Sequence, residues 1–307
     1  MRRNFGYVLV GLGGLLLTVA VLALVWAPGV VKKTPLDVET RTVYEGEGGK
    51  INTATGEFNV GPVYAVQETK ADSDNSSDDH VLFVETSCLV VDTGGERVCV
   101  DDSDPNLITA DIDIFATDRT TALAVDDENL PENAGPHEGL INKWPFDVEK
   151  KTYPYWDGLV GRPIDMVYDA TETIGGIETY RFVATVEDEP VDVAEGVSGT
   201  YTNVVTVNVD PKTGAIVKGG QDQQRYLDDG TQVLDVDIEW TAETVDDAID
   251  DAKANSRSLT VLLTLLPIVG FACGALFVLA GLLLLRRGRA GQGVARRAEG
   301  QPAKSNA

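Results

Sequence analysis

A concentration of aromatic and cationic side chains is the most distinctive chemical feature of this sequence. Residues 143–157 hold five aromatic residues, two prolines and three lysines within an otherwise acidic region. Aromatic faces beside ammonium groups could bind a lipid, a glycan or a partner protein. The candidate binding residues are Trp144, Phe146, Lys150, Lys151, Tyr153, Tyr155 and Trp156. The alternative is that the rings fill a core beneath a proline-stiffened loop. This is favoured for Trp144 and Trp156, because large aromatic residues are mostly buried.

Groups suited to catalysis or metal binding are sparse. The two histidines, His80 and His137, stand in no HExxH pattern and near no Gly-x-Ser-x-Gly turn, and no phosphate-binding loop occurs. The segment from Asp72 begins like a calcium loop, but Ser77 stands where glycine is required and Phe83 where the bidentate glutamate belongs. The sequence therefore predicts a protein that is not an enzyme and has no cofactor or metal site. A carboxylate-pair hydrolase stays open, since carboxylates are abundant.

Cys88 and Cys99 are a candidate disulfide. They lie on either side of Thr93 and Gly94, so a turn there would place them opposite each other on adjacent strands, within reach of a disulfide. An oxidising compartment favours that bond. The alternative is two small core residues.

The charge of the chain is very unevenly distributed. Its formal net charge is −24 over 307 residues, but residues 33–257 hold 48 acidic against 16 basic residues. Such a surface repels phosphate, so nucleic-acid binding is excluded. Adaptation to high salt or to a cationic cell wall would explain the acidity as well as a binding site would.

Two apolar runs without charge are long enough to span a bilayer. Residues 5–26 form the first and residues 259–285 the second, and 22 helical residues extend over roughly 33 Å. A cleaved signal peptide is the rival for the first run, but Pro28 follows its nearest cleavage site, so an uncleaved anchor is favoured. Arginines outside both runs place both termini in the cytoplasm.

The predicted organisation of this cell-membrane protein has five parts. They are a cytoplasmic N-terminus (1–4), a first transmembrane helix (5–27), an extracytoplasmic acidic β-rich domain that ends in a juxtamembrane helix (33–257), a second transmembrane helix (258–285) and a basic, disordered cytoplasmic tail (286–307).

Gly270 and Gly274 form a GxxxG pattern in the second apolar run. Small residues let helices approach closely, so the two helices could pack on each other, or the chain could form a homo-oligomer through these glycines. The alternative is that glycine is simply common in membrane helices. Neither run contains Asp, Glu, Lys, Arg or His, which argues against an ion pathway through the helices.

The external domain has the alternation typical of antiparallel β-structure. Residues 166–187 form a hairpin pattern around a Gly-Gly pair, and residues 202–240 form a three-stranded meander pattern with turns at 210–214 and 228–230. The clear helical pattern is residues 241–257. We therefore expect a mainly β external domain, either an antiparallel sandwich or a closed barrel with meander hairpins, plus two transmembrane α-helices.

Five segments in fixed order resemble the actinobacterial PorA family, many members of which are labelled only as a domain of unknown function. The segments are KWPF at 143–146, KKTYPYWD at 150–157, TETIGGIETYRF at 171–182, VDPKTGAIVK at 209–218 and QDQQR at 221–225. The resemblance covers nearly the whole chain, and residues 72–135 depart from it most. It implies a two-helix membrane protein of the cell envelope, loosely called a porin.

Two functions are compatible with these features. A transmembrane barrel needs apolar residues facing lipid, whereas these strands carry Asp and Glu on their wet faces, so we expect a water-soluble sheet. The first hypothesis is a non-enzymatic envelope protein whose external domain binds or transfers an apolar or wall-derived ligand. An apolar cavity would support it and a filled core would count against it. The second is an oligomeric porin-like channel component.

Overall fold

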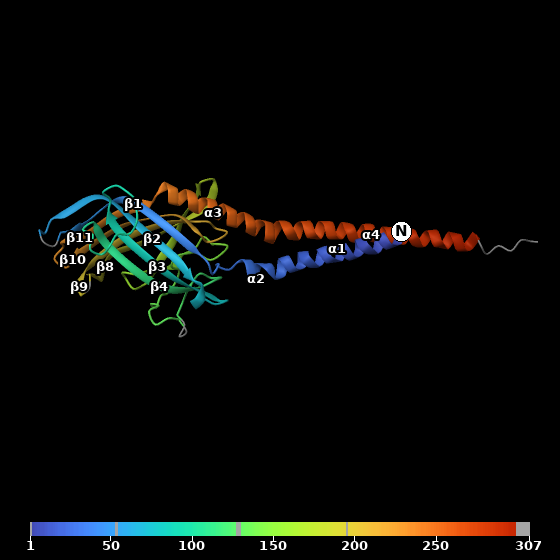
Figure 1. Cartoon of the computed structure of the whole chain (residues 1–307), viewed down its shortest axis with the longest axis horizontal. Helices are drawn as coiled ribbons and strands as arrows, with labels where there is room; N and C mark the ends of the chain where they lie inside the picture. Colours follow the sequence, from blue (N-terminus) through green and yellow to red (C-terminus); the bar gives the residue numbers. More distant parts are fainter. Residues whose placement is uncertain (1, 53–54, 127–129, 195, 299–307) are drawn as a thin grey trace, which may run out of the picture. The chain divides into compact units, whose positions relative to one another are not determined.

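A computed structural model describes residues 2–52, 55–126, 130–194 and 196–298 of the chain (Figure 1). These residues form two compact units. The helical unit comprises the segments up to Val31 and from Arg257 onward, and the β unit runs from Lys32 to Ser256.

The helices lie at the two ends of the chain. They are α1 (Arg2–Val25), α2 (Ala27–Val31), α3 (Ala242–Thr260) and α4 (Leu266–Ala298), with a π-helical turn, η2 (Val261–Leu265), between the last two. Two stretches, Asn4–Val25 and Ala242–Arg287, are long and apolar enough to cross a membrane. The two apolar helices predicted from the sequence are thus present.

Glycines bring the backbones of α1 and α4 into contact. A Cβ on Gly13 would lie 2.7 Å from the carbonyl oxygen of Gly274, and one on Gly270 would lie 2.9 Å from the Cβ of Ala20. The two glycines of the GxxxG pattern therefore pack on α1 of the same chain. Packing on the other helix of the same chain was one of the two alternatives, and a homo-oligomer through Gly270 and Gly274 stays a prediction.

The long C-terminal helix is irregular near Pro267. Proline lacks a backbone N–H and crowds the carbonyl four residues earlier, and the wider turn η2 just before it accommodates both effects. Helix α4 continues to Ala298, although the sequence suggests disorder from residue 286. Residues 299–307 of the expected tail lie outside the described residues.

Eleven strands of the described residues form one antiparallel sheet. They are β1 (Glu39–Ile51), β2 (Phe58–Asp72), β3 (His80–Val91), β4 (Leu107–Asp118), β5 (Ala124–Val125), β6 (Tyr153–Asp157), β7 (Arg162–Ile174), β8 (Ile177–Ala194), β9 (Val197–Val209), β10 (Ile216–Leu227) and β11 (Gln232–Trp240), with a 3₁₀ turn, η1 (Ser73–Asn75), after β2. The strand order is β5-β4-β3-β2-β1-β11-β10-β9-β8-β7-β6. The predicted mainly β architecture is confirmed.

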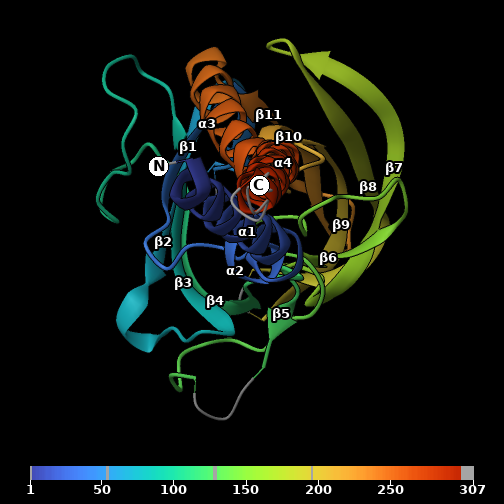
Figure 2. The ribbon, with the colours of Figure 1, turned by 90° about the vertical axis from the view of Figure 1, so that its right-hand side faces the viewer.

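One residue joins the two edges of this sheet. Leu140 pairs with Leu123, next to β5, and with Tyr155 of β6. The preceding Gly139 has φ +78°, and a Cβ there would lie 2.6 Å from the carbonyl oxygen of Pro154, so this close approach requires glycine. Figure 2 shows β1–β4 and β7–β9 as opposite walls of the curled sheet. The β unit is therefore a closed barrel and not a sandwich.

The two faces of the barrel wall differ in chemistry. On β11, Val236 and Ile238 are buried, whereas Asp237 and Glu239 between and beyond them are exposed. This alternation gives a wet outer face that carries carboxylates, which lipid would not accommodate.

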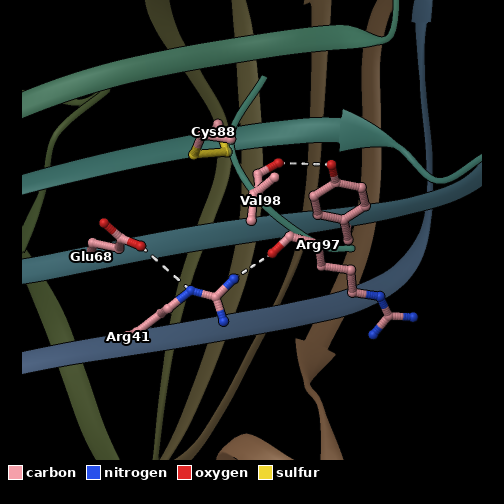
Figure 3. The surroundings of a disulfide bond; sticks show 7 residues. Arg41, Glu68, Cys88, Arg97 and Val98 are labelled. Carbon is pink, nitrogen blue, oxygen red and sulfur yellow. Dashed lines mark hydrogen bonds and ion pairs between the residues drawn. A yellow bond between two sulfur atoms is a disulfide. The ribbon is translucent and has the colours of Figure 1, made fainter. Parts of the chain in front are cut away.

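A segment that connects β3 and β4 covers part of the outer wall (Figure 3). Residues 97–100 form no strand, although the sequence suggests one opposite β3. The segment instead packs Val100 on Tyr64 and Val90, and the Tyr64 hydroxyl donates to the carbonyl oxygen of Val98 at 2.8 Å. Cys99 is bonded to Cys88 of β3. Apolar side chains on the outer face of β2 and β3 need a cover, and this segment provides it.

Candidate functional site

The aromatic rings of residues 143–157 lie mostly in the barrel core. Trp144 is fully buried and stacks on Tyr155, with ring centroids 5.7 Å apart and planes 24° apart. Phe182 of β8 lies 5.4 Å away on another side, and Tyr153 is 7% exposed. Trp156 is half-buried, with its ring 4.8 Å from that of His137.

The lysines of the same segment point in different directions. Lys143 lies 3.9 Å from the ring centroid of Phe146, and burial lowers its pKa to about 8. Lys150 is exposed, 4.7 Å from the ring of Tyr180, whereas Lys151 pairs with Glu149 at 2.6 Å. The seven candidate binding residues therefore form no single surface, and Trp144 and Tyr153 act as core residues.

Two pockets lie elsewhere in the β unit. One of about 170 Å³ is lined by Asp92, Glu96 and Asp104 among others, and one of about 340 Å³ includes Arg181 and Lys218. The aromatic segment lines neither of them. Among the described residues, no group of three or more His, Cys, Asp or Glu could hold a metal ion.

A polar cluster inside the barrel was not expected from the sequence. Glu85 on β3 stands directly opposite Asp113 on β4, and the Thr69 hydroxyl donates to its carboxylate at 2.7 Å. Burial raises the pKa of Glu85, and the charges of Asp113 and Asp111 add to that rise against the opposing hydrogen bonds from Thr69 and Gln67. An acidic patch thus lies on the inner side of β3 and β4.

Tyrosines from other strands approach this patch. The Tyr44 hydroxyl on β1 donates to Gln67 at 3.1 Å, and burial raises its pKa to about 12. Burial also raises the pKa of Tyr155, and the charges of Glu85 and Asp157 add to that rise. Residues of β1, β3, β6 and β9 therefore converge on one interior region.

His137 is linked to the same region through Asp113. Its Nε2 lies 2.9 Å from the Asp113 carboxylate and its Nδ1 lies 2.8 Å from the Gly135 carbonyl oxygen. Both partners accept hydrogen bonds, so the doubly protonated ring satisfies both. Burial lowers the pKa of His137, but these hydrogen bonds and the charges of Asp113 and Glu85 outweigh it and raise the pKa above its ordinary value.

The opposite wall contributes a second hydrogen-bonded group. The Tyr201 hydroxyl donates to the buried Asp157 carboxylate at 3.1 Å and accepts from the Asn203 amide at 2.7 Å. Arg225 on β10 stands directly opposite Tyr201. Two adjacent strands and the end of β6 thus hold a buried carboxylate, a phenol, an amide and a guanidinium together.

The interior can therefore form hydrogen bonds with a polar solute, and its walls differ in charge. Glu85 and Asp113 lie on β3 and β4, whereas the cation Arg225 on β10 lies with a single carboxylate, Asp157, at the end of β6. The signal for this cluster is weak in the sequence, because Gln223 and Arg225 lie in a run that is polar at every position from 221 to 225. Alternation cannot tell an inward from an outward side chain there.

Two apolar helices and a closed barrel with a charged outside and a polar interior define a membrane-associated β-barrel protein. The family model described as Porin PorA matches residues 5–283. The chain therefore belongs to the PorA porin family, which confirms the resemblance read from its sequence. It is 24% identical to "Porin PorA" of Corynebacterium amycolatum, and the match covers 72% of this chain and 77% of that protein.

Proposed function

We propose that this chain is a porin-like channel component of the cell envelope in which the barrel interior binds and conducts a polar solute. In this proposal the helices anchor the chain, both termini lie in the cytoplasm and the β unit stands in the aqueous space outside. The observation that carries the proposal is the location of the polar groups. Glu85 stands opposite Asp113 and Arg225 stands opposite Tyr201 on the inner side of the sheet, whereas neither apolar helical run contains Asp, Glu, Lys, Arg or His.

The first hypothesis, an apolar or wall-derived ligand within the external domain, has less support. Trp144 and Phe182 have no exposed surface, and the cluster around them is filled by other side chains of β6 to β9. A filled core counts against an apolar ligand at this position. We propose no catalytic role.

The full chain reconstituted in a planar bilayer tests the channel proposal. We expect conductance that prefers potassium over chloride, since interior carboxylates attract cations. Glu85→Gln should lower the potassium-to-chloride permeability ratio at least twofold. Asp237→Asn, which removes the same charge from the outer face of β11, should leave the ratio unchanged. Absence of conductance, or equal ratios in the two variants, would overturn the proposal.

A further inference from the structure

Four buried side-chain atoms have no hydrogen-bond partner among the described residues: Nε1 of Trp144, Nε1 of Trp240, Oδ1 of Asn203 and Nε of Arg225. The last two lie on adjacent strands, β9 and β10. Asn203 is 3% exposed, so bulk water does not reach its side chain. Buried polar groups in native proteins are nearly always satisfied, by protein or by a bound molecule, which makes this pair informative.

The two atoms belong to neighbouring side chains on one face of the sheet. Asn203 of β9 stands opposite Gln223 of β10, and Arg225 stands opposite Tyr201, so Asn203 and Arg225 are diagonal neighbours. Diagonal neighbours have Cα atoms about 7–8 Å apart. That spacing is compatible with one oxygen that forms hydrogen bonds of about 2.9 Å to each side chain.

The orientation of the Asn203 amide is set by its surroundings. The single proton of the Tyr201 hydroxyl goes to the Asp157 carboxylate, so this hydroxyl can only accept from Asn203. The amide nitrogen of Asn203 must then face Tyr201, and Oδ1 is left as an acceptor without a donor.

We infer that a hydroxyl oxygen, from water or from an alcohol group of a polar solute, binds between Asn203 and Arg225. A hydroxyl donates its proton to Oδ1 of Asn203 and accepts from the Nε–H of Arg225, so a single atom satisfies both groups. A carboxylate or phosphate supplies no donor and meets the charge of Asp157, and an ammonium group meets the charge of Arg225. The site lies in the barrel interior that we propose binds and conducts a polar solute, so this inference rests on that proposed function.

A double-mutant cycle on the full chain in detergent tests this site through stability. With the oxygen bound, each single variant leaves the other side chain's polar group with an incomplete hydrogen-bond network. Asn203→Leu and Arg225→Met should therefore each lower the denaturant midpoint. The double variant has removed both polar groups, so no unsatisfied partner is left, and its midpoint should fall by less than the sum of the two single shifts. Thr202→Val and Gln224→Met, opposite each other on the outer face, are the matched control pair, and their shifts should be additive.

Without a bound oxygen, each single variant loses only its own contacts, such as the Asn203 bond to Tyr201, and the two shifts would be additive. That result overturns the inference. An experimental density map of the wild-type chain gives a second readout that does not depend on variants folding or on conductance. A compact peak between the two side chains identifies water and an extended feature identifies a solute hydroxyl. Both support the site, and an empty position contradicts it.

Discussion

The Ser256 hydroxyl near the end of α3 donates a hydrogen bond to the Asp210 carboxylate in the turn between β9 and β10, at 2.8 Å. The two residues are 46 positions apart in the chain. Asp210 is 6% exposed and also accepts from the Thr213 hydroxyl at 2.6 Å and from the Thr213 amide. This contact holds α3 against the barrel at the place where the chain leaves the β unit.

Removal of the Asp210 carboxylate should destabilise the β unit strongly. Asp210→Ala leaves the donors of Ser256 and Thr213 without their acceptor, and hydrogen bonds to a buried charge contribute about 1.5–3 kcal/mol each. We expect the free energy of unfolding to fall by about 2–4 kcal/mol in chemical denaturation. Asp237→Ala on the exposed outer face is the control, and equal losses from the two variants would contradict the account.

Trp144 should behave as a core residue and not as part of a binding surface. Its side chain has no exposed area, and Trp→Ala substitutions in cores cost about 3–5 kcal/mol. Trp144→Ala should show a loss of that order by denaturation, and Trp144→Phe a smaller one. Lys151→Ala, at an exposed position of the same segment, should change stability little. A Trp144→Ala chain as stable as the wild type would contradict this placement.

The disulfide should stabilise the segment that covers β2 and β3. Cys88 and Cys99 are 11 positions apart, and closing a loop of that length contributes about 3 kcal/mol in the chain-entropy model. Cys88→Ser with Cys99→Ser should lower the free energy of unfolding by about that amount. The double variant should also make the amide of Val100 exchange faster with deuterium. Unchanged exchange there would show that other contacts hold the segment.

Two adjacent glycines of α1, Gly13 and Gly14, differ in what surrounds them. A Cβ on Gly13 would meet the backbone of α4, whereas one on Gly14 would meet nothing within 4 Å. Gly13→Ile should therefore separate the helices and lower the midpoint of unfolding in mixed micelles titrated with SDS, while Gly14→Ile should not. Equal effects would mean that α1 and α4 do not pack through this face.

The raised pKa of His137 makes stability depend on pH in a defined direction. A histidine whose folded pKa exceeds its unfolded value of about 6.5 stabilises the fold fully below pH 6.5. It loses that contribution as pH rises through the folded pKa. The stability of the wild type relative to His137→Gln should therefore decline above pH 6.5. NMR titration of a His80→Gln chain, in which His137 is the remaining histidine, should give a pKa above 6.5.

The sequence predicted the fold class where its patterns were strong. The Gly175–Gly176 pair, with φ of +54° and +83°, makes the predicted hairpin turn between β7 and β8, and the meander of β9 to β11 follows the predicted order. Strands β1 and β2 gave no such signal. The run Gly46 to Gly49 lowers strand propensity, although a Cβ on Gly49 would lie 2.1 Å from the carbonyl oxygen of Asn59 and the pairing requires glycine there.

Features that depend on contacts between distant residues could not be predicted from the sequence. The choice between sandwich and barrel depends on Leu140, a single residue that pairs with both edges. The interior cluster depends on register, because Glu85 and Asn203 resemble ordinary solvent-facing positions until their neighbours across the strands are known. The aromatic segment stood out for its composition, but composition does not tell a core from a surface.

Impermeant labelling of protoplasts tests the central claim most directly, with Cys273→Ser as the background. We predict that Asp237→Cys on the outer face of the barrel reacts with a membrane-impermeant maleimide in intact protoplasts. Ser305→Cys in the C-terminal tail should react only after lysis. Protection of the Asp237→Cys chain in intact protoplasts, or labelling of the Ser305→Cys chain before lysis, would contradict a barrel that stands in the aqueous space outside on two membrane helices.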